Sequence, residues 1–158
     1  MSQHRIVLAL GSNLGDSAAI LAQAIEEIAE FVTAMKISSY YRTEPVGGPA
    51  QPDYLNAVLL GETELAQEEL LARLQAIETH HGRLRTTRWG ARTLDIDLID
   101  FDSKPWQSER LTLPHPRAHE RAFVLLPWNE VDPEAILIGH GSVSSLLATL
   151  DSSGVLRR

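Results

Sequence analysis

Two aspartates two residues apart, Asp95 and Asp97, have the spacing that most directly suggests chemistry in this 158-residue chain. Leu94, Ile96 and Leu98 alternate with them, which is the pattern of a strand with one buried face. The two carboxylates then project from the other face, about 6.6 Å apart at the backbone. Like charges so close repel each other unless cations lie nearby. The pair, together with substrate phosphates, would supply the oxygen ligands that Mg²⁺ prefers.

Basic side chains gather in the same part of the chain. Seven of the twelve arginines lie between positions 83 and 121, namely Arg83, Arg85, Arg88, Arg92, Arg110, Arg117 and Arg121. The planar guanidinium fork of arginine suits phosphate oxygens. The aspartates and arginines together predict a site for Mg²⁺ and a polyphosphate. The alternative is a solvated basic face next to two exposed strand residues.

A second group of residues has the chemistry to bind a flat heterocycle. Aromatic or amide side chains lie in or beside polar segments at Tyr54, Asn56, Trp89 and Phe123. Flat heterocycles are often bound by aromatic stacking combined with amide and backbone hydrogen bonds. Each of the four residues could instead serve packing. Asn56 is the least easily explained in that way, because it interrupts a segment rich in leucine and valine.

Two histidines four residues apart, His115 and His119, have a spacing that suits zinc on a helical face. Pro114 and Pro116 argue against a regular helix through His115, and no third soft ligand is evident. We therefore expect His115 to donate to phosphate, with an ordinary surface histidine as the alternative.

Composition narrows the class of protein. Hydrophobic content of 44% and charged content of 22% are typical of one globular domain, which we expect to span residues 1–158. The absence of cysteine excludes disulfides and thiolate zinc sites. The net charge of −7 argues against a nucleic-acid partner. No apolar run approaches the roughly 20 residues that span a bilayer, and no signal-peptide pattern is present. We expect a cytoplasmic protein with no membrane partner, acting as a monomer.

Hydrophobic periodicity predicts strands over 6–10, 36–43 and 54–62, and a further strand through Asp95 and Asp97. Helices are expected over 17–31, 66–81 and 142–150, with a short helix over 122–128 interrupted at Pro127. Segments 44–52 and 83–92 are expected to be long loops. The turn over 11–16 lacks the lysine of a Walker phosphate loop, so we expect Asp16 or Ser17 to cap a helix there.

The predicted order of elements is strand–helix–strand–strand–helix–strand. This is the order of a ferredoxin-like α+β sandwich, in which helices cover one face of an antiparallel sheet. The other face and the two long loops are then expected to be free to carry a site. The fold alone does not specify a function.

Several segments together form a combination that is specific to one family. They are Gly11–Gly15, Tyr41–Pro45, Gln51–Asn56, Glu78 followed by Gly82–Arg85, Arg88–Asp97 and Leu113–Arg117. On these residues the chain resembles the 6-hydroxymethyl-7,8-dihydropterin pyrophosphokinases of folate biosynthesis over nearly its whole length. The resemblance implies transfer of the β,γ-pyrophosphoryl group of ATP to the hydroxymethyl group of the pterin, with release of AMP.

The resemblance also implies roles for individual residues. Asp95 and Asp97 would bind two Mg²⁺ ions, and Arg85 and Arg92 would neutralise charge on the transferring group. The pterin would be bound by Thr43, Glu44, Val46, Tyr54, Asn56, Trp89 and Phe123. The ATP pocket would comprise Leu71, Gln75, Glu78, Arg83, Arg88, Arg92, Leu98, Arg110, Leu111, Thr112, His115 and Arg121.

Two other functions use part of the same pattern. A ferredoxin-like sheet can stack RNA bases on strand aromatics, although the negative charge and the carboxylate pair oppose this function. A two-metal phosphohydrolase would also use Asp95 and Asp97. Formation of AMP only when a pterin alcohol is supplied would distinguish transfer from hydrolysis.

Overall fold

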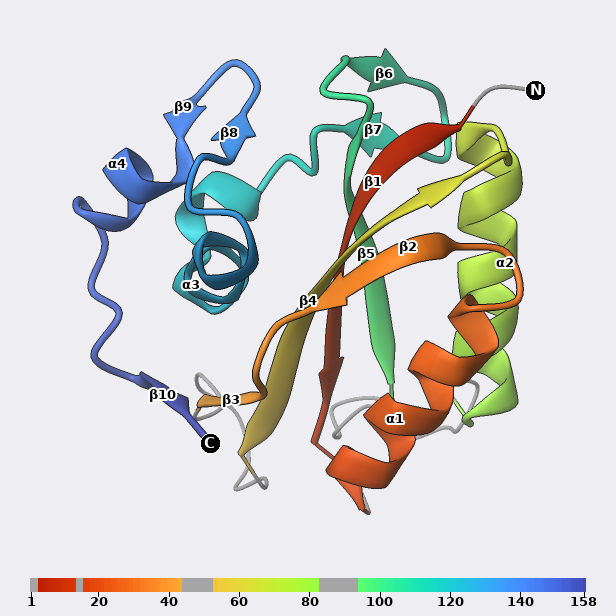
Figure 1. Ribbon diagram of the computed structural model, residues 1–158, viewed down its shortest axis with the longest axis horizontal. Helices are drawn as coiled ribbons and strands as arrows, with labels where there is room; N and C mark the ends of the chain where they lie inside the picture. The colour runs from red at the N-terminus through yellow and green to blue at the C-terminus, as the bar shows by residue number, and fades with distance from the viewer. Residues whose placement is uncertain (1–2, 14–15, 44–52, 83–93) are drawn as a thin grey trace.

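The computed structural model describes residues 3–13, 16–43, 53–82 and 94–158 (Figure 1). The central sheet has the strand order β10-β3-β4-β1-β5, with β2 also paired to β4, and every pairing is antiparallel. Its strands are β1 (His4–Ser12), β2 (Thr33–Ile37), β3 (Tyr41–Thr43), β4 (Tyr54–Thr63), β5 (Asp95–Phe101) and β10 (Val155–Arg157). The predicted α+β class, with an antiparallel sheet and packed helices, is confirmed.

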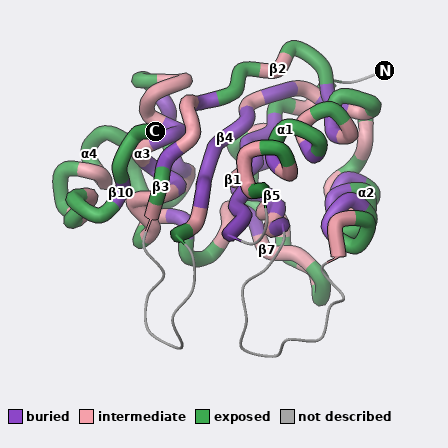
Figure 2. Tube along the Cα trace, turned by 90° about the horizontal axis from the view of Figure 1, so that it is seen from below, coloured by how far each residue is buried: buried purple, intermediate pink, exposed green. Residues whose placement is uncertain are grey.

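Two long helices, α1 (Ser17–Ile28) and α2 (Gln67–His80), lie side by side against one face of the sheet in Figure 1. Leu21 and Ile28 from α1 and Leu70 and Leu74 from α2 are fully buried there, in one core with the inward side chains of β1 such as Leu8. Figure 2 shows this burial along the strands and on the inward side of α2. Burying these side chains stabilises the layer by roughly 1.5–3 kcal/mol each.

Helix α1 begins at the predicted cap but ends at Ile28, three residues before the predicted end at 31, and α2 matches its predicted bounds to within one residue. The Asp16 carboxylate accepts the N–H of Ala19 at 3.2 Å, so Asp16 is the N-cap of α1. Gly82 follows α2 with φ of 89°, a conformation that glycine adopts without steric cost and that ends the helix.

The opposite face of the sheet is not free, which corrects the expectation from the fold class. Helix α3 (Ala122–Val131) packs across it, and Val124, Leu125 and Trp128 form a second core with Val58 and Ile99. The remaining helical segments of the described residues are η1 (Ala118–Glu120) and α4 (Val143–Leu147). Two small antiparallel hairpins lie outside the central sheet. One pairs β6 (Trp106–Gln107) with β7 (Thr112–Leu113), and the other pairs β8 (Ile136–Leu137) with β9 (Gly141–Ser142).

Pro127 does not interrupt α3, contrary to the prediction. It lies inside the helix and is buried with its neighbours. An internal proline costs about 3 kcal/mol because it removes a hydrogen bond and crowds the preceding turn. Full burial of Val124 and Leu125 and near-complete burial of Trp128 offsets that cost. The sequence pattern alone does not register this packing.

The strand predicted over 36–43 is divided into β2 and β3. Ser39 lies between them, and its backbone N–H and hydroxyl both donate to the Glu130 carboxylate on α3, at 3.1 and 2.9 Å. Tyr41 donates to the same carboxylate at 2.7 Å. Burial by itself would raise the pKa of Glu130, but these hydrogen bonds and the positive charge of Arg157 hold that pKa below its ordinary value. A contact with a distant helix therefore breaks the strand.

Two further differences concern the C-terminal region. Helix α4 ends at Leu147 instead of Leu150, and the chain then returns to pair β10 with β3. Neither β10 nor the two small hairpins was predicted. Within the described ranges, no helix is long and apolar enough to cross a membrane.

Candidate functional site

The aspartate pair lies at the beginning of β5, as its alternating pattern predicts. Ile96 and Leu98 are buried in the core between the sheet and helices α1 and α2, whereas Asp95 and Asp97 are only partly buried. In the register with β1, Asp95 lies opposite Gly11 and Asp97 opposite Ala9. The Asp97 side chain is 42% exposed, and its Oδ2 lies 3.7 Å from Nη1 of Arg121. The Asp97 carboxylate is therefore partly open to solvent and lies beside a cation.

Glu78, on helix α2, holds the beginning of β5 through a hydrogen bond to its backbone. Its carboxylate, on the last turn of α2, accepts the backbone N–H of Ile96 at 2.7 Å, and Glu78 is only 3% exposed. Leaving a buried N–H without an acceptor costs about 1–3 kcal/mol, so this hydrogen bond stabilises the local arrangement. Because Ile96 stands between the two aspartates, helix α2 helps to set where both carboxylates lie.

A cavity of about 390 Å³ lies beside β1 and β5, on the face of the sheet that packs against α3. Its lining comes from strands, from the segment before η1 and from α3, and comprises Ala9, Leu10, Gly11, Thr43, Tyr54, Asn56, Asp95, Asp97, Arg117, Arg121 and Phe123. The aromatic residues Tyr54 and Phe123 reach it from β4 and α3. The Arg121 guanidinium lies 5.7 Å from the centre of the Phe123 ring, in cation–π range. The cavity combines two aromatic walls with a charged rim.

Asn56 and Thr43 form the polar part of this cavity. Asn56 is 6% exposed, and its Nδ2 donates to Oγ1 of Thr43 on the neighbouring strand. Gly11 lies directly opposite Asn56 across the β1–β4 pairing. A Cβ at Gly11 would lie 3.0 Å from the Asn56 amide oxygen, so glycine leaves room for this amide. Gly11 thus positions a polar group that sequence reasoning had assigned to ligand binding.

A second cavity, of about 330 Å³, lies between α2 and the segment that follows β6. It is lined by Leu71, Gln75, Glu78, Ile96, Asp97, Leu98, Glu109, Arg110, Leu111, Thr112, His115 and Pro116. Across it, Arg110 donates to the side-chain oxygen of Gln75 at 3.3 Å. Asp97 lines both cavities, so two ligands would meet at this carboxylate.

The segment that carries Arg110 is tied to α2 by one carboxylate. The indole N–H of Trp106 and the hydroxyl of Ser108 donate to Glu68 at 2.8 and 2.6 Å. Ser108 in turn accepts the backbone N–H of Leu111 at 3.2 Å. These bonds hold one wall of the second cavity against the helix that forms the other wall.

His115 lines the second cavity in its neutral form. Burial lowers the pKa of His115, Asp97 opposes that shift, and Arg121 and Arg117 add to it. Its Nδ1 accepts the backbone N–H of Arg117 at 3.2 Å, which leaves Nε2 as the protonated nitrogen. A neutral imidazole with a fixed Nε2–H can donate one hydrogen bond to an oxygen in the cavity. His119 has other surroundings, because it stacks on His140 with ring centres 4.0 Å apart.

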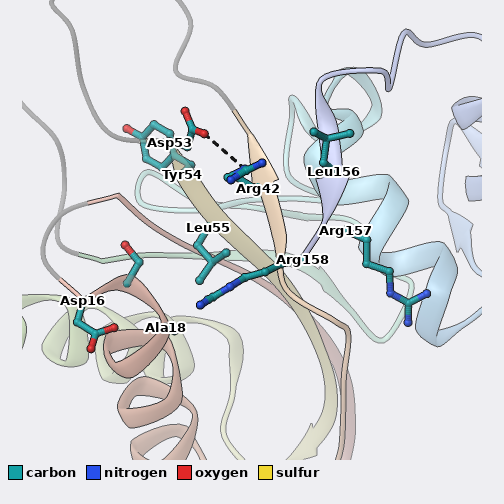
Figure 3. Close-up of a pocket in the computed structure, with 10 residues that line it drawn as sticks. Asp16, Ala18, Arg42, Asp53, Tyr54, Leu55, Leu156, Arg157 and Arg158 are labelled. Carbon is teal, nitrogen blue, oxygen red and sulfur yellow. Dashed lines mark ion pairs between the residues drawn. The ribbon is translucent and has the colours of Figure 1, made fainter.

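A neighbouring cavity of about 360 Å³ lies beside Tyr54, between the start of α1 and the end of β10 (Figure 3). An ion pair between Arg42 and Asp53, at 3.5 Å, lies along its wall. The aspartate pair of β5 does not line it. We therefore place the candidate site at the two cavities that share Asp97.

The structure thus brings together the predicted residues that it describes. Around the first cavity are Thr43, Tyr54, Asn56 and Phe123, and around the second are Leu71, Gln75, Glu78, Leu98, Arg110, Leu111, Thr112 and His115. Arg121 was assigned to ATP but lines the first cavity, next to Asp97. Glu44, Val46, Arg83, Arg85, Arg88, Trp89 and Arg92 lie outside the described residues, so their placement stays a prediction.

Some lining residues were not in the predicted set. Gly11, Arg117, Ile96, Glu109 and Pro116 line one or other cavity. Arg117 belongs to the arginine-rich region and could have been chosen by charge. Gly11 and Ile96 contribute through the strand register and backbone. Both lie in segments that carry the family resemblance, but the sequence assigned them no role of their own.

The fold and the two cavities that share Asp97 define a small α+β protein with a carboxylate pair at its candidate site. Residues 7–133 match the family model described as 7,8-dihydro-6-hydroxymethylpterin-pyrophosphokinase, so the chain belongs to this family. It is 43% identical over 155 residues to a 2-amino-4-hydroxy-6-hydroxymethyldihydropteridine pyrophosphokinase of Methylorubrum extorquens, covering 97% of this chain and 98% of that protein. It is 40% identical to the enzyme of the same name from Haemophilus influenzae, covering 89% of each chain.

Solved structures show the same fold. A crystal structure of HPPK-DHPS in complex with substrates matches with a TM-score of 0.77 at 12% identity, covering 94% of this chain and 43% of that one. A Plasmodium falciparum HPPK-DHPS structure matches with a TM-score of 0.72 at 14% identity, covering 93% of this chain and 45% of that one. The chain spans less than half the length of these solved chains.

Proposed function

We propose that this protein transfers the pyrophosphoryl group of ATP to the hydroxymethyl group of 6-hydroxymethyl-7,8-dihydropterin, giving AMP and the pterin diphosphate in folate biosynthesis. Membership of the pyrophosphokinase family supports this reaction. The observation that carries the proposal is the position of Asp97, which lines both cavities. The reacting ends of two substrates would meet there.

The pterin occupies the cavity on β1, β3, β4 and α3. Its ring stacks between Tyr54 and Phe123, which line that cavity from two different elements. Asn56 and Thr43, already joined by a hydrogen bond, face the polar edge of the ring. Fixed polar partners discriminate strongly against a ligand that leaves them unpaired. Glu44, Val46 and Trp89 complete the binding site in this proposal.

ATP occupies the cavity along α2, with its phosphates toward Asp97. Leu71, Leu98 and Leu111 supply apolar surface for the base, and Gln75, Glu78, Arg110 and Thr112 supply polar contacts. The neutral His115 donates through Nε2 to a phosphate oxygen. Arg121 contributes positive charge from the pterin side of Asp97. Arg83, Arg85, Arg88 and Arg92 are proposed to bind the phosphates from the segment between α2 and β5.

Asp95 and Asp97 suit divalent cations in their donor chemistry. Both are carboxylates on one face of β5, partly exposed and next to a cavity, and Mg²⁺ takes oxygen ligands of this kind while retaining water. We propose that they hold two Mg²⁺ ions. When bound, the ions would neutralise phosphate charge and make the pterin hydroxyl more acidic.

The reaction is an in-line displacement at the β-phosphorus of ATP. The pterin hydroxyl oxygen forms a bond to that phosphorus as the bond from the β-phosphorus to the bridging α-phosphate oxygen breaks. AMP leaves with the electron pair of the broken bond, and the hydroxyl proton passes to solvent water. The protein contributes chiefly by orienting the two substrates and stabilising charge on the phosphoryl oxygens. Arg85 and Arg92 are proposed to neutralise that charge and to help exclude water. We propose that a monomer performs this reaction, with no nucleic-acid partner.

One assay tests the function. The full chain is incubated with ATP and Mg²⁺, with and without 6-hydroxymethyl-7,8-dihydropterin, and the products are identified by mass. We expect AMP and pterin diphosphate only when the pterin alcohol is present. Release of phosphate or pyrophosphate without the acceptor would support a phosphohydrolase and overturn the proposal.

A further inference from the structure

Away from both cavities, three potential metal ligands meet at the ends of the two long helices. Glu27 lies one residue before the end of α1, His80 is the last residue of α2, and His81 follows it. One ligand atom from each residue lies within 4.8 Å of the others. None of the three lines either cavity of the candidate site.

The two imidazoles bind opposite oxygens of the same carboxylate. His80 Nδ1 lies 2.7 Å from Oε1 of Glu27, and His81 Nε2 lies 2.5 Å from Oε2. The His81 side chain is 8% exposed, whereas that of His80 is 71% exposed. One ligand is therefore anchored in the protein, and the site opens to solvent beside the other.

The end of α2 explains how consecutive residues reach one carboxylate. Successive side chains in a helix diverge by about 100°. His81 has left the helical conformation, with φ of −93° and ψ of 18°, and Gly82 then turns the chain with φ of 89°. This change of backbone direction brings the His81 ring toward the same carboxylate as the His80 ring, and the ring centres lie 5.1 Å apart.

Electrostatics at this point favours a cation. The C-terminal ends of both α1 and α2 are present, and the carbonyl end of a helix carries a partial negative charge. The Glu27 carboxylate adds a full negative charge.

We propose that Glu27, His80 and His81 form a binding site for a divalent transition metal of the Zn²⁺ class, joining the ends of α1 and α2. Two imidazoles and one carboxylate are a known zinc ligand set, with water as the fourth ligand. Zinc–ligand distances of about 2.0–2.2 Å separate tetrahedral ligands by roughly 3.4 Å. The N···O distances of His80 and His81 must therefore lengthen by roughly 0.7 and 0.9 Å. The proton on each coordinating nitrogen moves, by exchange with solvent, to the other nitrogen of the same ring, so each imidazole binds the metal in its neutral form.

The site is expected to stabilise the protein without taking part in the transfer reaction. His81 lies three residues beyond Glu78, which holds Ile96 between the two aspartates. A metal joining Glu27 to His80 and His81 would restrain the end of α2 near that contact. At a Zn²⁺ concentration 100 times the dissociation constant, the melting temperature should rise by about 5–10 °C.

The test measures Zn²⁺ and Co²⁺ binding to the full chain without a polyhistidine tag, by calorimetry and by Co²⁺ absorption spectra. Excess Mg²⁺ is present to occupy carboxylate sites, because imidazole ligands do not suit Mg²⁺. We expect one equivalent of Zn²⁺ with a tetrahedral Co²⁺ spectrum. His81→Ala and Glu27→Gln should weaken binding at least tenfold, and so should His80→Ala, whose exposed side chain can be removed without disturbing the fold.

Two control variants locate the metal. His140→Ala removes an exposed histidine that stacks on His119, and Asp97→Asn alters the β5 carboxylate pair. Both should bind Zn²⁺ as the unmodified chain does. Absence of Zn²⁺ binding, retention of binding in the folded His80→Ala variant, or its loss in Asp97→Asn would each overturn the proposal. None of these measurements depends on pyrophosphoryl transfer.

Discussion

The clearest test of the candidate site is the substitution Asp97→Asn, which keeps the size of the side chain and removes one negative charge. In the folded protein Asp97 is 42% exposed, and its described ion pair with Arg121 is 3.7 Å long. Exposed ion pairs of this kind are worth about 0–1 kcal/mol. The substitution also relieves repulsion from Asp95. We therefore expect the free energy of unfolding to change by less than about 1 kcal/mol.

The effect on catalysis should be much larger. If Asp97 holds a cation at the junction of the two cavities, the variant loses several kcal/mol of charge stabilisation in the transition state. A loss of about 4 kcal/mol corresponds to a turnover reduced roughly 1,000-fold. Pterin binding should remain detectable, because Tyr54, Phe123 and Asn56 still line the first cavity.

Three measurements are needed on the same preparation: AMP formation with the pterin acceptor, pterin binding by fluorescence, and thermal unfolding. Asp151→Asn is a matched control, because Asp151 is an exposed aspartate that lines neither cavity and accepts only a local hydrogen bond from Ser153. It should retain full turnover. Near-normal turnover in Asp97→Asn would refute the metal role, and a large fall in melting temperature would show that Asp97 acts through folding.

Three further predictions concern groups that support the site. Glu78→Gln disturbs the buried hydrogen bond from the N–H of Ile96 and should lower the free energy of unfolding by about 1–3 kcal/mol in urea titrations. An unchanged urea midpoint would contradict this account. The pKa of Glu130 is lowered on folding, so its contribution to stability is present above pH 4.5 and is lost as the pH falls through the lower folded-state pKa. When the free energy of unfolding is measured from pH 3 to 7, Glu130→Gln should therefore lose less stability on acidification than the unmodified chain. Parallel curves for the two proteins would contradict this role of Glu130. Gly11→Ala places a methyl group 3.0 Å from the Asn56 amide oxygen and should raise the KM for the pterin about tenfold in steady-state assays. An unaltered KM would show that Asn56 does not need the space that glycine leaves.

Much of the fold could be predicted because local patterns and burial agree. The alternation through Asp95 and Asp97 predicted a strand with one buried face, and β5 has that face packed in the helix-covered core. The periodicity of the segment over 66–81 predicted α2 to within one residue at each end. These elements depend on interactions between near neighbours in the chain, which the sequence displays directly.

Two of the errors share a cause, which is contact with a distant element. Glu130 on α3 binds Ser39 and Tyr41 and thereby divides the predicted strand into β2 and β3. Packing of Trp128 against the sheet lets α3 continue through Pro127. No local pattern contains either partner, so neither outcome could be derived from the segment itself.

For the candidate site, too, some features follow from the sequence and others only from the tertiary structure. Residue types and spacing alone indicated a carboxylate pair, a set of arginines and a few aromatic and amide groups, because charge repulsion and hydrogen-bonding capacity are properties of the residues themselves. Only the tertiary structure decided that Asp97 lies where two cavities meet, that Gly11 makes room for Asn56, and that Glu27 meets His80 and His81. Those relations depend on strand register and on the packing of helices that are far apart in the chain, which local residue patterns do not specify.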